Sequence, residues 1–403
     1  MIYKNVGVIG LGYVGLPLLE QLIKKKFDVV GFDIDSKKID KIYRSNKFKK
    51  VRLTTNYKDL KDRNFFIICV PTPIDKKKKP DLGPLKLASK IVGKNLDIND
   101  IVVYESTVFP GCTEDICIPI LEKFSELKIN KDFFCGYSPE RINPEDKKHT
   151  LENIIKVTSG SNEHSAKIID KFYKKIIPAG TYLAESIKIA ESAKIIENVQ
   201  RDLNIALVNE LSLIFDKMKL DIHKILKAAS TKWNFISYKP GLVGGHCIGV
   251  DPYYLTYKCE KLKYKPKVIL AGRTVNDNMP NEIAKNVISN LGKKKTNVKN
   301  KKVLIIGYSF KENSKDIRNT KVLNLFKNLK RTIRFVDIFD PIVDTKEIYK
   351  EHRIKVKRKI NKKNFYDALI LAVPHEKIIK DGKNKIMKYL KKDAYIVDIK
   401  KVL

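Results

Sequence analysis

The segment Asn5–Gly15 reads Asn-Val-Gly-Val-Ile-Gly-Leu-Gly-Tyr-Val-Gly, and it decides the fold that we predict for this chain. Its apolar first half is typical of a short buried strand, and its last six residues have the spacing GxGxxG. A helical stretch continues to Leu22, and a second apolar run, Val29–Phe32, ends in Asp33. Strand, glycine-rich turn, helix, strand and acid are, in this order, the fingerprint of a dinucleotide-binding unit.

The chemistry of this segment favours NAD as the cofactor. The glycines permit a tight turn and let a pyrophosphate approach the N-terminus of the following helix. Asp33 would accept hydrogen bonds from the ribose hydroxyls and repel the 2′-phosphate of NADP, although Lys37 and Lys38 lie just beyond it and weaken that argument. The cofactor-binding residues predicted in this region are Gly10, Gly12, Tyr13, Val14, Gly15, Asp33 and Lys38.

Further apolar runs alternate with helix-compatible segments, at Phe65–Val70, Ile101–Glu105 and Ile154–Thr158. This alternation predicts a parallel sheet with helices on both faces. Loops at the carboxyl ends of such strands bind ligands. Thr72 and Thr107 lie in two of these loops, so each is a candidate to contact the cofactor, although either could equally cap a helix.

An acid and a base, Glu140 and Arg141, stand side by side after the strand-like run Phe133–Gly136. Their place after a strand favours a role in binding or catalysis. A solvated pair at the surface is an equally good interpretation of the sequence alone.

The longest helical pattern extends from Ala184 to about Lys217 and is apolar on nearly every side, which predicts burial between domains or subunits. Lys194, Asn198 and Arg201 interrupt one face at the spacing i, i+4, i+7. Charges in the middle of a buried face are costly unless they are paired or used. They therefore indicate either a functional site or a buried salt-bridge network.

The octapeptide Gly244–Asp251 reads Gly-Gly-His-Cys-Ile-Gly-Val-Asp. Glycines around Cys247 would let a substrate approach the backbone closely, and a cysteine thiolate can form a covalent intermediate. The alternative is that Cys247 is a small buried hydrophobic residue, as free cysteines often are.

A second alternating set of strands follows Lys293–Lys302, which has the composition of a linker. The segment after its first strand, Gly307–Lys311, lacks GxGxxG, so we expect no second dinucleotide there. The runs that we assign to strands are Val303–Ile306, Phe335–Phe339, Leu369–Val373 and Tyr395–Val397.

The predicted fold class is α/β, with two doubly wound (Rossmann-like) parallel-sheet domains joined by a long central helix and a helical middle domain. The expected domains are residues 1–181 for NAD binding, 182–295 for the helical catalytic and dimerisation region, and 296–403 for the second sheet. We expect a cleft between the sheets, with Cys247 in it.

Composition excludes several classes of protein. The 403 residues carry 81 Lys+Arg against 46 Asp+Glu, a net charge of +35, but the excess is spread along the chain without a recognition motif. A general enrichment of surface lysine explains this better than a specific nucleic-acid partner. No stretch approaches the ~20 apolar residues of a membrane span. Six cysteines without a CxxC pair or a secretory signal favour a reduced, cytoplasmic protein, and we predict no metal site.

Seven motifs in order along the chain resemble the UDP-glucose/GDP-mannose dehydrogenase family: GLGYVG, VPTP, YESTVFPG, GYSPERINP, AKIIENVQRDLNIALVNE, GLVGGHCIGVDPYYL and GYSFKENSKDIRNT. HCIGVDPYYL and FKEN…DIRNT look most like the branch that oxidises UDP-N-acetylhexosamines (UDP-GlcNAc or UDP-GalNAc). The resemblance implies conversion of the sugar 6-hydroxyl to a carboxylate with two NAD per turnover, for surface polysaccharide synthesis. UDP-glucose or UDP-ManNAc oxidation, or an inactive nucleotide-sugar- or polyanion-binding protein, are the alternatives.

The resemblance also implies roles for individual residues. Cys247 would be the nucleophile, Lys194 the acid/base or oxyanion partner, and Glu140 and Asp251 would handle protons. The implied catalytic set is Cys247, Lys194, Asn198, Asp251, Glu140 and Thr107. The implied substrate contacts are Arg141, Ile142, Lys194, Asn198, Arg201, Gly244, Phe310 and Lys311.

One further implied contact makes the protein a homo-oligomer, a dimer at least. Arg318 matches a position that reaches the cofactor of a neighbouring subunit. A basic substrate contact from a neighbour would come from Lys232, Trp233 or Lys239, and the sequence does not distinguish them.

Overall fold

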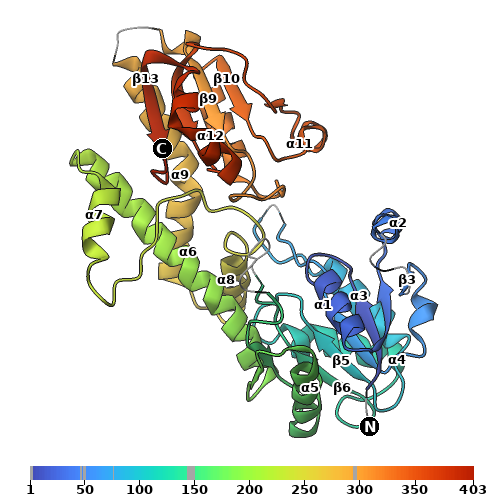
Figure 1. The fold of residues 1–403 in the computed structure, drawn as a ribbon. Coiled ribbons are helices and arrows are strands. Elements are labelled where there is room, and N and C mark those ends of the chain that lie inside the picture. Colours follow the sequence, from blue (N-terminus) through green and yellow to red (C-terminus); the bar gives the residue numbers. More distant parts are fainter. Residues whose placement is uncertain (1–2, 46–47, 49–50, 76, 143–149, 294–296) are drawn as a thin grey trace. The chain divides into compact units, whose positions relative to one another are not determined.

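The structure is a computed structural model that describes residues 3–45, 48, 51–75, 77–142, 150–293 and 297–403. The chain forms two compact units, Met1–Glu197 with Tyr253–Lys265, and Asn198–Pro252 with Pro266–Leu403 (Figure 1). Two of the three boundaries between the units fall within the helices α6 (Ile187–Lys217) and α8 (Asp251–Lys261), and the third lies between Lys265 and Pro266, just before α9 (Lys267–Gly292). The division into three domains made above stays a prediction.

The first unit is built on a parallel sheet of order β3-β2-β1-β4-β5-β6, the arrangement of dinucleotide-binding folds. Its strands are β1 (Asn5–Ile9), β2 (Asp28–Phe32), β3 (Arg52–Thr54), β4 (Phe65–Ile68), β5 (Ile101–Tyr104) and β6 (Phe134–Tyr137). Its helical elements, apart from its parts of α6 and α8, are α1 (Gly15–Lys24), α2 (Ser36–Arg44), η1 (Tyr57–Leu60), α3 (Gly83–Gly93), η2 (Thr113–Cys117), α4 (Ile118–Ser125) and α5 (Glu163–Ile176). The predicted doubly wound sheet is confirmed.

One strand assignment was wrong. The run Ile154–Thr158 does not join this sheet: it forms β7 (Lys156–Thr158), which pairs with β8 (Thr181–Leu183) in a separate ribbon. The edge position in the sheet belongs to β6. An apolar run shows that a strand is buried, but its period contains no information about which sheet it joins.

Helices cover both faces of the first sheet because its central strands are apolar on both sides. Val6 and Phe65 lie in a core that includes Phe172 of α5 and residues of α1. On the opposite face the hydroxyl of Tyr104 lies 2.7 Å from Ser89 Oγ of α3.

The second unit contains a parallel sheet of order β11-β10-β9-β12-β13. Its strands are β9 (Lys302–Ile306), β10 (Phe335–Phe339), β11 (Val356–Lys357), β12 (Tyr366–Leu371) and β13 (Leu390–Asp398). Its helical elements, apart from its parts of α6 and α8, are α7 (Ile222–Ala229), α9 (Lys267–Gly292), η3 (Val298–Asn300), α10 (Lys321–Lys330), α11 (Thr345–His352) and α12 (Glu376–Met387). The second predicted sheet is thus confirmed, and β11 is a strand that the sequence did not reveal.

This sheet is also covered on both faces. Successive side chains of β9 point to opposite faces of the sheet. Val303 packs with α9 and α10, whereas Leu304 packs with Ile378 of α12. Of the predicted linker, residues 294–296 lie outside the described residues.

Helix α6 begins at Ile187, three residues later than expected, and is buried only in part. Ile187, Ile195 and Val199 are buried, but Leu207 is 55% exposed. Within the described part of the chain, no helix is long and apolar enough to cross a membrane.

Candidate functional site

The glycine-rich loop after β1 has the shape that a dinucleotide requires. Gly10 has φ +94°, and a Cβ there would lie 2.9 Å from the carbonyl oxygen of Cys69. A Cβ on Gly15 would lie 2.0 Å from the carbonyl oxygen of Gly10, so both glycines are needed for the turn itself. A Cβ on Gly12 would meet nothing within 4 Å, which leaves open space beside the N-terminus of α1. The loop therefore fits the pyrophosphate of NAD.

Asp33 lies at the end of β2, as predicted. Its Oδ2 accepts hydrogen bonds from the backbone N–H of Leu11 (2.9 Å) and from Lys38 Nζ (2.7 Å), and its Oδ1 accepts from Asp35 N (3.1 Å). The ion pair with Lys38 offsets part of the carboxylate charge. Repulsion of a 2′-phosphate is therefore weaker than it would be beside an unpaired aspartate.

Thr72 and Thr107 are half-buried residues of the loops after β4 and β5. Neither caps a helix, because the N-cap residues of the helical elements that follow are Leu82 and Cys112. The carbonyl oxygen of Thr72 accepts a hydrogen bond from Tyr254 OH (2.8 Å). The capping interpretation is thus wrong, and contact with the cofactor stays a prediction.

Glu140 and Arg141 do not form a solvated surface pair. Glu140 is 7% exposed, and its Oε1 accepts hydrogen bonds from the backbone N–H groups of Arg141 (2.7 Å) and Ile142 (2.5 Å). The Arg141 guanidinium instead donates to the carbonyl oxygen of Ile155 (2.9 Å) and pairs with Glu197 on α6 (2.8 Å). A buried carboxylate after a sheet strand is a candidate proton acceptor.

A buried cation behind Glu140 was missed by the sequence analysis. Lys156 is 3% exposed, and its Nζ lies 2.9 Å from Glu105 and 3.7 Å from Glu140 Oε2. Tyr173 OH donates to the other oxygen of Glu105 (2.6 Å). Burial raises the pKa of Glu105, although Lys156 partly counters this. A lysine inside the apolar run Ile154–Thr158 was the available signal.

The predicted polar face of α6 is only partly buried. Lys194 and Asn198 are 8% and 7% exposed, but Arg201 is exposed, so it was wrongly placed on a buried face. Among the described residues, Lys194 has no hydrogen-bond or ion-pair partner, which argues against a buried salt-bridge network. Asn198 Nδ2 donates to Asp251 Oδ2 (2.5 Å).

Cys247 lies in the turn that leads into α8. Its carbonyl oxygen accepts the N–H groups of Val250 (3.0 Å) and Asp251 (2.8 Å), so the thiol and the Asp251 carboxylate belong to one turn. The side chain of Cys247 is partly exposed, which excludes the interpretation as a buried hydrophobic residue. The turn therefore combines a reachable thiol with a carboxylate that Asn198 holds.

The two glycines before this turn have a packing role. A Cβ on Gly244 would lie 2.6 Å from the carbonyl oxygen of Asn319, and a Cβ on Gly245 would lie 2.5 Å from the ring of Phe310. We expected the glycines to admit a substrate. The structure shows the loop Phe310–Asn319 packed closely against Gly244 and Gly245, and the substrate contact expected at Gly244 stays a prediction.

That loop carries three predicted ligand contacts, Phe310, Lys311 and Arg318. Asp316 lies 3.3 Å from His246 Nε2 and 2.6 Å from Arg318 NH2. Burial would raise the pKa of Asp316, but its contacts with His246 and Arg318 outweigh burial and hold the pKa below its usual value. The ionised Asp316 thus ties the loop to the cysteine-bearing turn.

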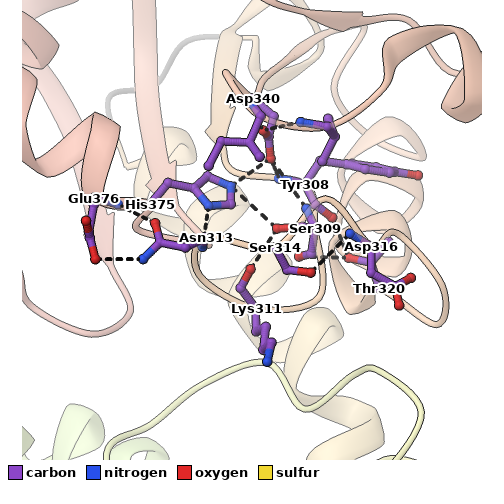
Figure 2. A network of polar contacts seen from close by, with 12 residues as sticks. Tyr308, Ser309, Lys311, Asn313, Ser314, Asp316, Thr320, Asp340, His375 and Glu376 are labelled. Atoms are coloured by element: carbon purple, nitrogen blue, oxygen red, sulfur yellow. Dashed lines mark hydrogen bonds and ion pairs between the residues drawn. The ribbon is translucent and has the colours of Figure 1, made fainter. Parts of the chain in front are cut away.

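A buried polar network orders the base of the same loop. Figure 2 shows His375 between Asp340, which accepts from its Nε2 (2.9 Å), and Asn313, whose backbone N–H donates to its Nδ1 (2.9 Å). Ser309 Oγ lies 3.4 Å from the same Nε2 that faces Asp340. Because the serine and the aspartate share one imidazole nitrogen, this is not a Ser-His-Asp catalytic arrangement. The network is a scaffold for the loop.

A basic pocket in the second unit is another feature that the sequence did not reveal. Its lining includes Lys224, Lys227, Lys239, Lys400 and Lys401. Lysine at such density favours an anionic ligand.

The structure therefore gathers most predicted residues within each unit. Those that follow the carboxyl ends of strands in the first unit are Gly10, Gly12, Tyr13, Val14, Gly15, Asp33, Lys38, Thr72, Thr107, Glu140, Arg141 and Ile142. Those that lie together in the second unit are Asn198, Gly244, Cys247, Asp251, Phe310, Lys311 and Arg318. In the described parts of the chain, no three His, Cys, Asp or Glu side chains form a group that could hold a metal ion.

Comparison with known proteins agrees with this organisation. Residues 4–177, 188–278 and 304–403 match the NAD binding, central and UDP binding domains of the UDP-glucose/GDP-mannose dehydrogenase family. The chain is 50% identical to UDP-N-acetyl-D-glucosamine 6-dehydrogenase of Salmonella typhi, over 99% of this chain and 96% of that protein. It is 48% identical to the enzyme of the same name from Pseudomonas aeruginosa, over 99% and 97%.

A solved structure, a UDP-D-ManNAc dehydrogenase of Pyrococcus horikoshii, superposes with a TM-score of 0.89 at 28% identity, over 99% of this chain and 96% of that chain. The match of the family extends over all three regions, and the glycine-rich loop fits the cofactor that the family uses. The chain belongs to the UDP-glucose/GDP-mannose dehydrogenase family, and is an NAD-dependent nucleotide-sugar dehydrogenase.

Proposed function

We propose that the protein oxidises the 6-hydroxyl of a UDP-N-acetylhexosamine, UDP-GlcNAc or UDP-GalNAc, to the carboxylate. The observation that carries this proposal is that the partly exposed Cys247 lies in one turn with Asp251. The Asp251 carboxylate accepts a hydrogen bond from Asn198 Nδ2. The 50% identity to the Salmonella typhi enzyme supports the choice of substrate.

The reaction proceeds in two oxidations and one hydrolysis. NAD supplies the hydride acceptor in both oxidations. The alcohol first loses a hydride and a proton to become an aldehyde. The Cys247 thiol then adds to the aldehyde carbon, and the thiohemiacetal loses a second hydride and a proton to become a thioester. Water breaks the C–S bond, which releases the carboxylate, a proton and the free thiol.

The other residues stabilise charge and move protons. The Lys194 ammonium, which lacks a partner in the described part of the chain, stabilises the negative oxygen that develops in each oxidation, and Asn198 donates to the same oxygen. Such a donor contributes ~3–4 kcal/mol in comparable sites. Glu140 and Asp251 accept the released protons, and Thr107 orients the reacting hydroxyl.

The basic pocket suits the diphosphate of the substrate. Lys400 and Lys401 are paired with Glu312 and Asp221, whereas Lys239 makes no ion pair within the described residues. Lys239→Met is therefore expected to raise the KM for the UDP-sugar while the KM for NAD is unchanged. An unchanged KM for both would remove the pocket from the substrate site.

We also propose a homo-oligomer. The side chains of Ile189, Ile196, Leu207 and Ile214 on α6, and of Met218 directly after it, are 45–58% exposed. Their spacing of 7, 11, 7 and 4 residues places them on one stripe of the helix. Leu207→Glu should give a smaller species in light scattering than the unaltered protein, and Lys217→Glu, off the stripe, should not. A monomeric unaltered protein at micromolar concentration would contradict the proposal.

The role that we propose is a cytoplasmic step in surface polysaccharide synthesis. The six cysteines form no disulfide in the described structure, which is consistent with a reducing compartment.

The test of the substrate is the kcat/KM for NADH production with UDP-GlcNAc, UDP-GalNAc, UDP-ManNAc and UDP-glucose measured side by side. UDP-ManNAc is the second candidate, because the Pyrococcus horikoshii protein bears that name. The proposal expects UDP-GlcNAc or UDP-GalNAc to exceed the other two. A higher value for UDP-ManNAc or UDP-glucose would overturn it.

A further inference from the structure

An ion cluster lies buried at the carboxyl edge of the first sheet. Lys156 comes from β7, Glu105 follows β5 and Glu140 follows β6, and the three are 3%, 1% and 7% exposed. Among the residues that the structure describes, Cys69, after β4, and Tyr173, on α5, are further titratable side chains that face the cluster. Two carboxylates thus share one ammonium group.

The two oxygens of Glu140 differ in their surroundings. Oε1 receives two backbone N–H groups, which fix the direction of the carboxylate. Oε2 is buried without a hydrogen bond in the described structure, and its nearest cation is Lys156, 3.7 Å away. A buried acceptor that lacks a hydrogen bond is unfavourable. The carboxylate is therefore held in one direction, and its Oε2 has room for a hydrogen-bond donor.

The cluster is not explained by stability alone. Burying ions costs several kcal/mol each, and apolar residues of similar volume often stabilise a fold equally well or better. Burial alone would lower the pKa of Lys156, but Glu105 and Glu140 outweigh it and keep the lysine protonated. The cation is thus held permanently beside Glu140.

We propose that Lys156 is a positioning residue of the dehydrogenase: it holds Glu140 in the ionised form that accepts a proton at Oε2, while Glu105 competes for the same ammonium and limits its effect. Lys156 itself neither gains nor loses a proton. The inference rests on the proposed role of Glu140. It identifies Lys156 as the charge that sets the pH range in which Glu140 accepts a proton.

The test compares the dependence of kcat on pH in two variants that change the cluster in opposite directions. Lys156→Met removes the cation, which makes ionised Glu140 less favourable, so the acidic limb of the profile moves to higher pH by about 1 or more. Glu105→Gln removes the competing anion, which makes ionised Glu140 more favourable, so the limb moves to lower pH. Lys156→Arg retains the charge and should restore most of the unaltered profile.

The matched control is Lys174→Met, which removes an exposed lysine of α5 from its ion pair with Asp170 (2.7 Å) and should leave the limb in place. The proposal is supported if the acidic limb moves in opposite directions in Lys156→Met and Glu105→Gln. If Lys156→Met does not fold, a shift of the limb to lower pH in Glu105→Gln supports it. An unmoved limb in both, or a shift in the same direction, overturns it. Glu140→Gln separates the two claims. If this variant retains full kcat, the proposed role of Glu140 fails. If it is inactive but the acidic limb does not move in Lys156→Met and Glu105→Gln, only the role of Lys156 fails.

Discussion

The two sheets begin in the same way, but only one of them is open to a dinucleotide. After β1 and after β9 the chain turns at a glycine with positive φ, Gly10 at +94° and Gly307 at +87°. Each glycine N–H donates at 2.8 Å to the neighbouring strand, to the carbonyl oxygens of Phe32 and Phe339. The turn out of the first strand is therefore shared.

The acid that follows the neighbouring strand is shared as well. Asp33 accepts the N–H of Leu11 (2.9 Å), and Asp340 accepts the N–H of Tyr308 (2.7 Å). Both carboxylates hold the first residue of the loop beyond the glycine. The difference lies in what else they contact.

The surroundings of the two acids differ, although both side chains are buried, with Asp33 6% and Asp340 0% exposed. The partner of Asp33 is Lys38, whose side chain is 39% exposed, and Gly12 leaves open space in the same loop. The partner of Asp340 is His375, and both side chains are 0% exposed. A common strand-turn-acid layout thus binds a dinucleotide only where the chain leaves room, and elsewhere its own side chains use the same groups to order a loop.

The largest effect expected from this comparison comes from the paired glycine variants Gly307→Ala and Gly12→Ala. A Cβ at 307 would lie 2.4 Å from the carbonyl oxygen of Val373, so the variant should lose about 2–3 kcal/mol of unfolding free energy. Gly12→Ala meets no protein atom and should keep the unfolding midpoint while its affinity for NAD falls at least about tenfold. Calorimetry and NAD titration measure both. A destabilised Gly12→Ala that still binds NAD would break the comparison.

The next effect concerns cofactor choice. Asp33→Asn should lower the ratio of kcat/KM for NAD to that for NADP by at least about tenfold, because one charged hydrogen bond of ~1.5–3 kcal/mol is lost and the 2′-phosphate is no longer repelled. Asp340→Asn should leave that ratio unchanged and lower the unfolding temperature instead. A protein that already prefers NADP would refute the role of Asp33.

A smaller effect is expected at His375. His375→Gln retains a donor toward Asp340 but loses the acceptor for Asn313, whereas His375→Asn retains an acceptor and loses the donor. Each should weaken the binding of UDP about threefold to tenfold, since a net hydrogen bond contributes ~0.5–1.5 kcal/mol. NAD affinity serves as the control and should not change. Equal losses for NAD and UDP would indicate general unfolding rather than a disordered loop.

The smallest effect is the pH dependence of stability. Glu191 on α6 accepts the N–H groups of Gly111 and Thr113, and burial raises its pKa to about 7. The folded protein therefore binds more protons here than the unfolded chain, so stability is lost as pH rises from about 4 through 7. The unfolding midpoint of Glu191→Gln minus that of the unaltered protein should therefore increase as the pH is raised from 5 to 8.

The second unit provides the contrast for this measurement. Burial would raise the pKa of Asp340, but His375 outweighs it and lowers the pKa, so its contribution is lost only in acid. Asp340→Asn should accordingly show a constant midpoint difference over the same range. A constant difference for Glu191→Gln would contradict the assignment of its raised pKa.

Local patterns predicted the fold well because both sheets are encoded by short apolar strands and turns. Asn5–Gly15 and Asp33 are close in sequence, so their chemistry was readable, and Cys247 with Asp251 lies in one turn. The sequence did not show which sheet the strand in Ile154–Thr158 joins, because tertiary packing selects the partners of a strand. The hydrophobic period and the burial of the strand would be the same in either sheet.

The parts of the site that sequence analysis missed are contacts between distant residues. Lys156 meets a carboxylate 51 positions away, and His375 meets one 35 positions away. No periodicity connects such pairs. The exposed position of Arg201 was missed for a related reason, because the apolar pattern of α6 does not say which side the rest of the chain covers.

The most direct measurement of the central claim is the number of NADH molecules formed for each UDP-N-acetylhexosamine consumed, in the unaltered protein and in Cys247→Ala. Covalent catalysis at Cys247 predicts two NADH and the uronate for the unaltered protein. The variant retains some oxidation of the alcohol but forms no thioester, so its yield of uronate collapses. Two NADH and full uronate from Cys247→Ala at a comparable rate would contradict the account.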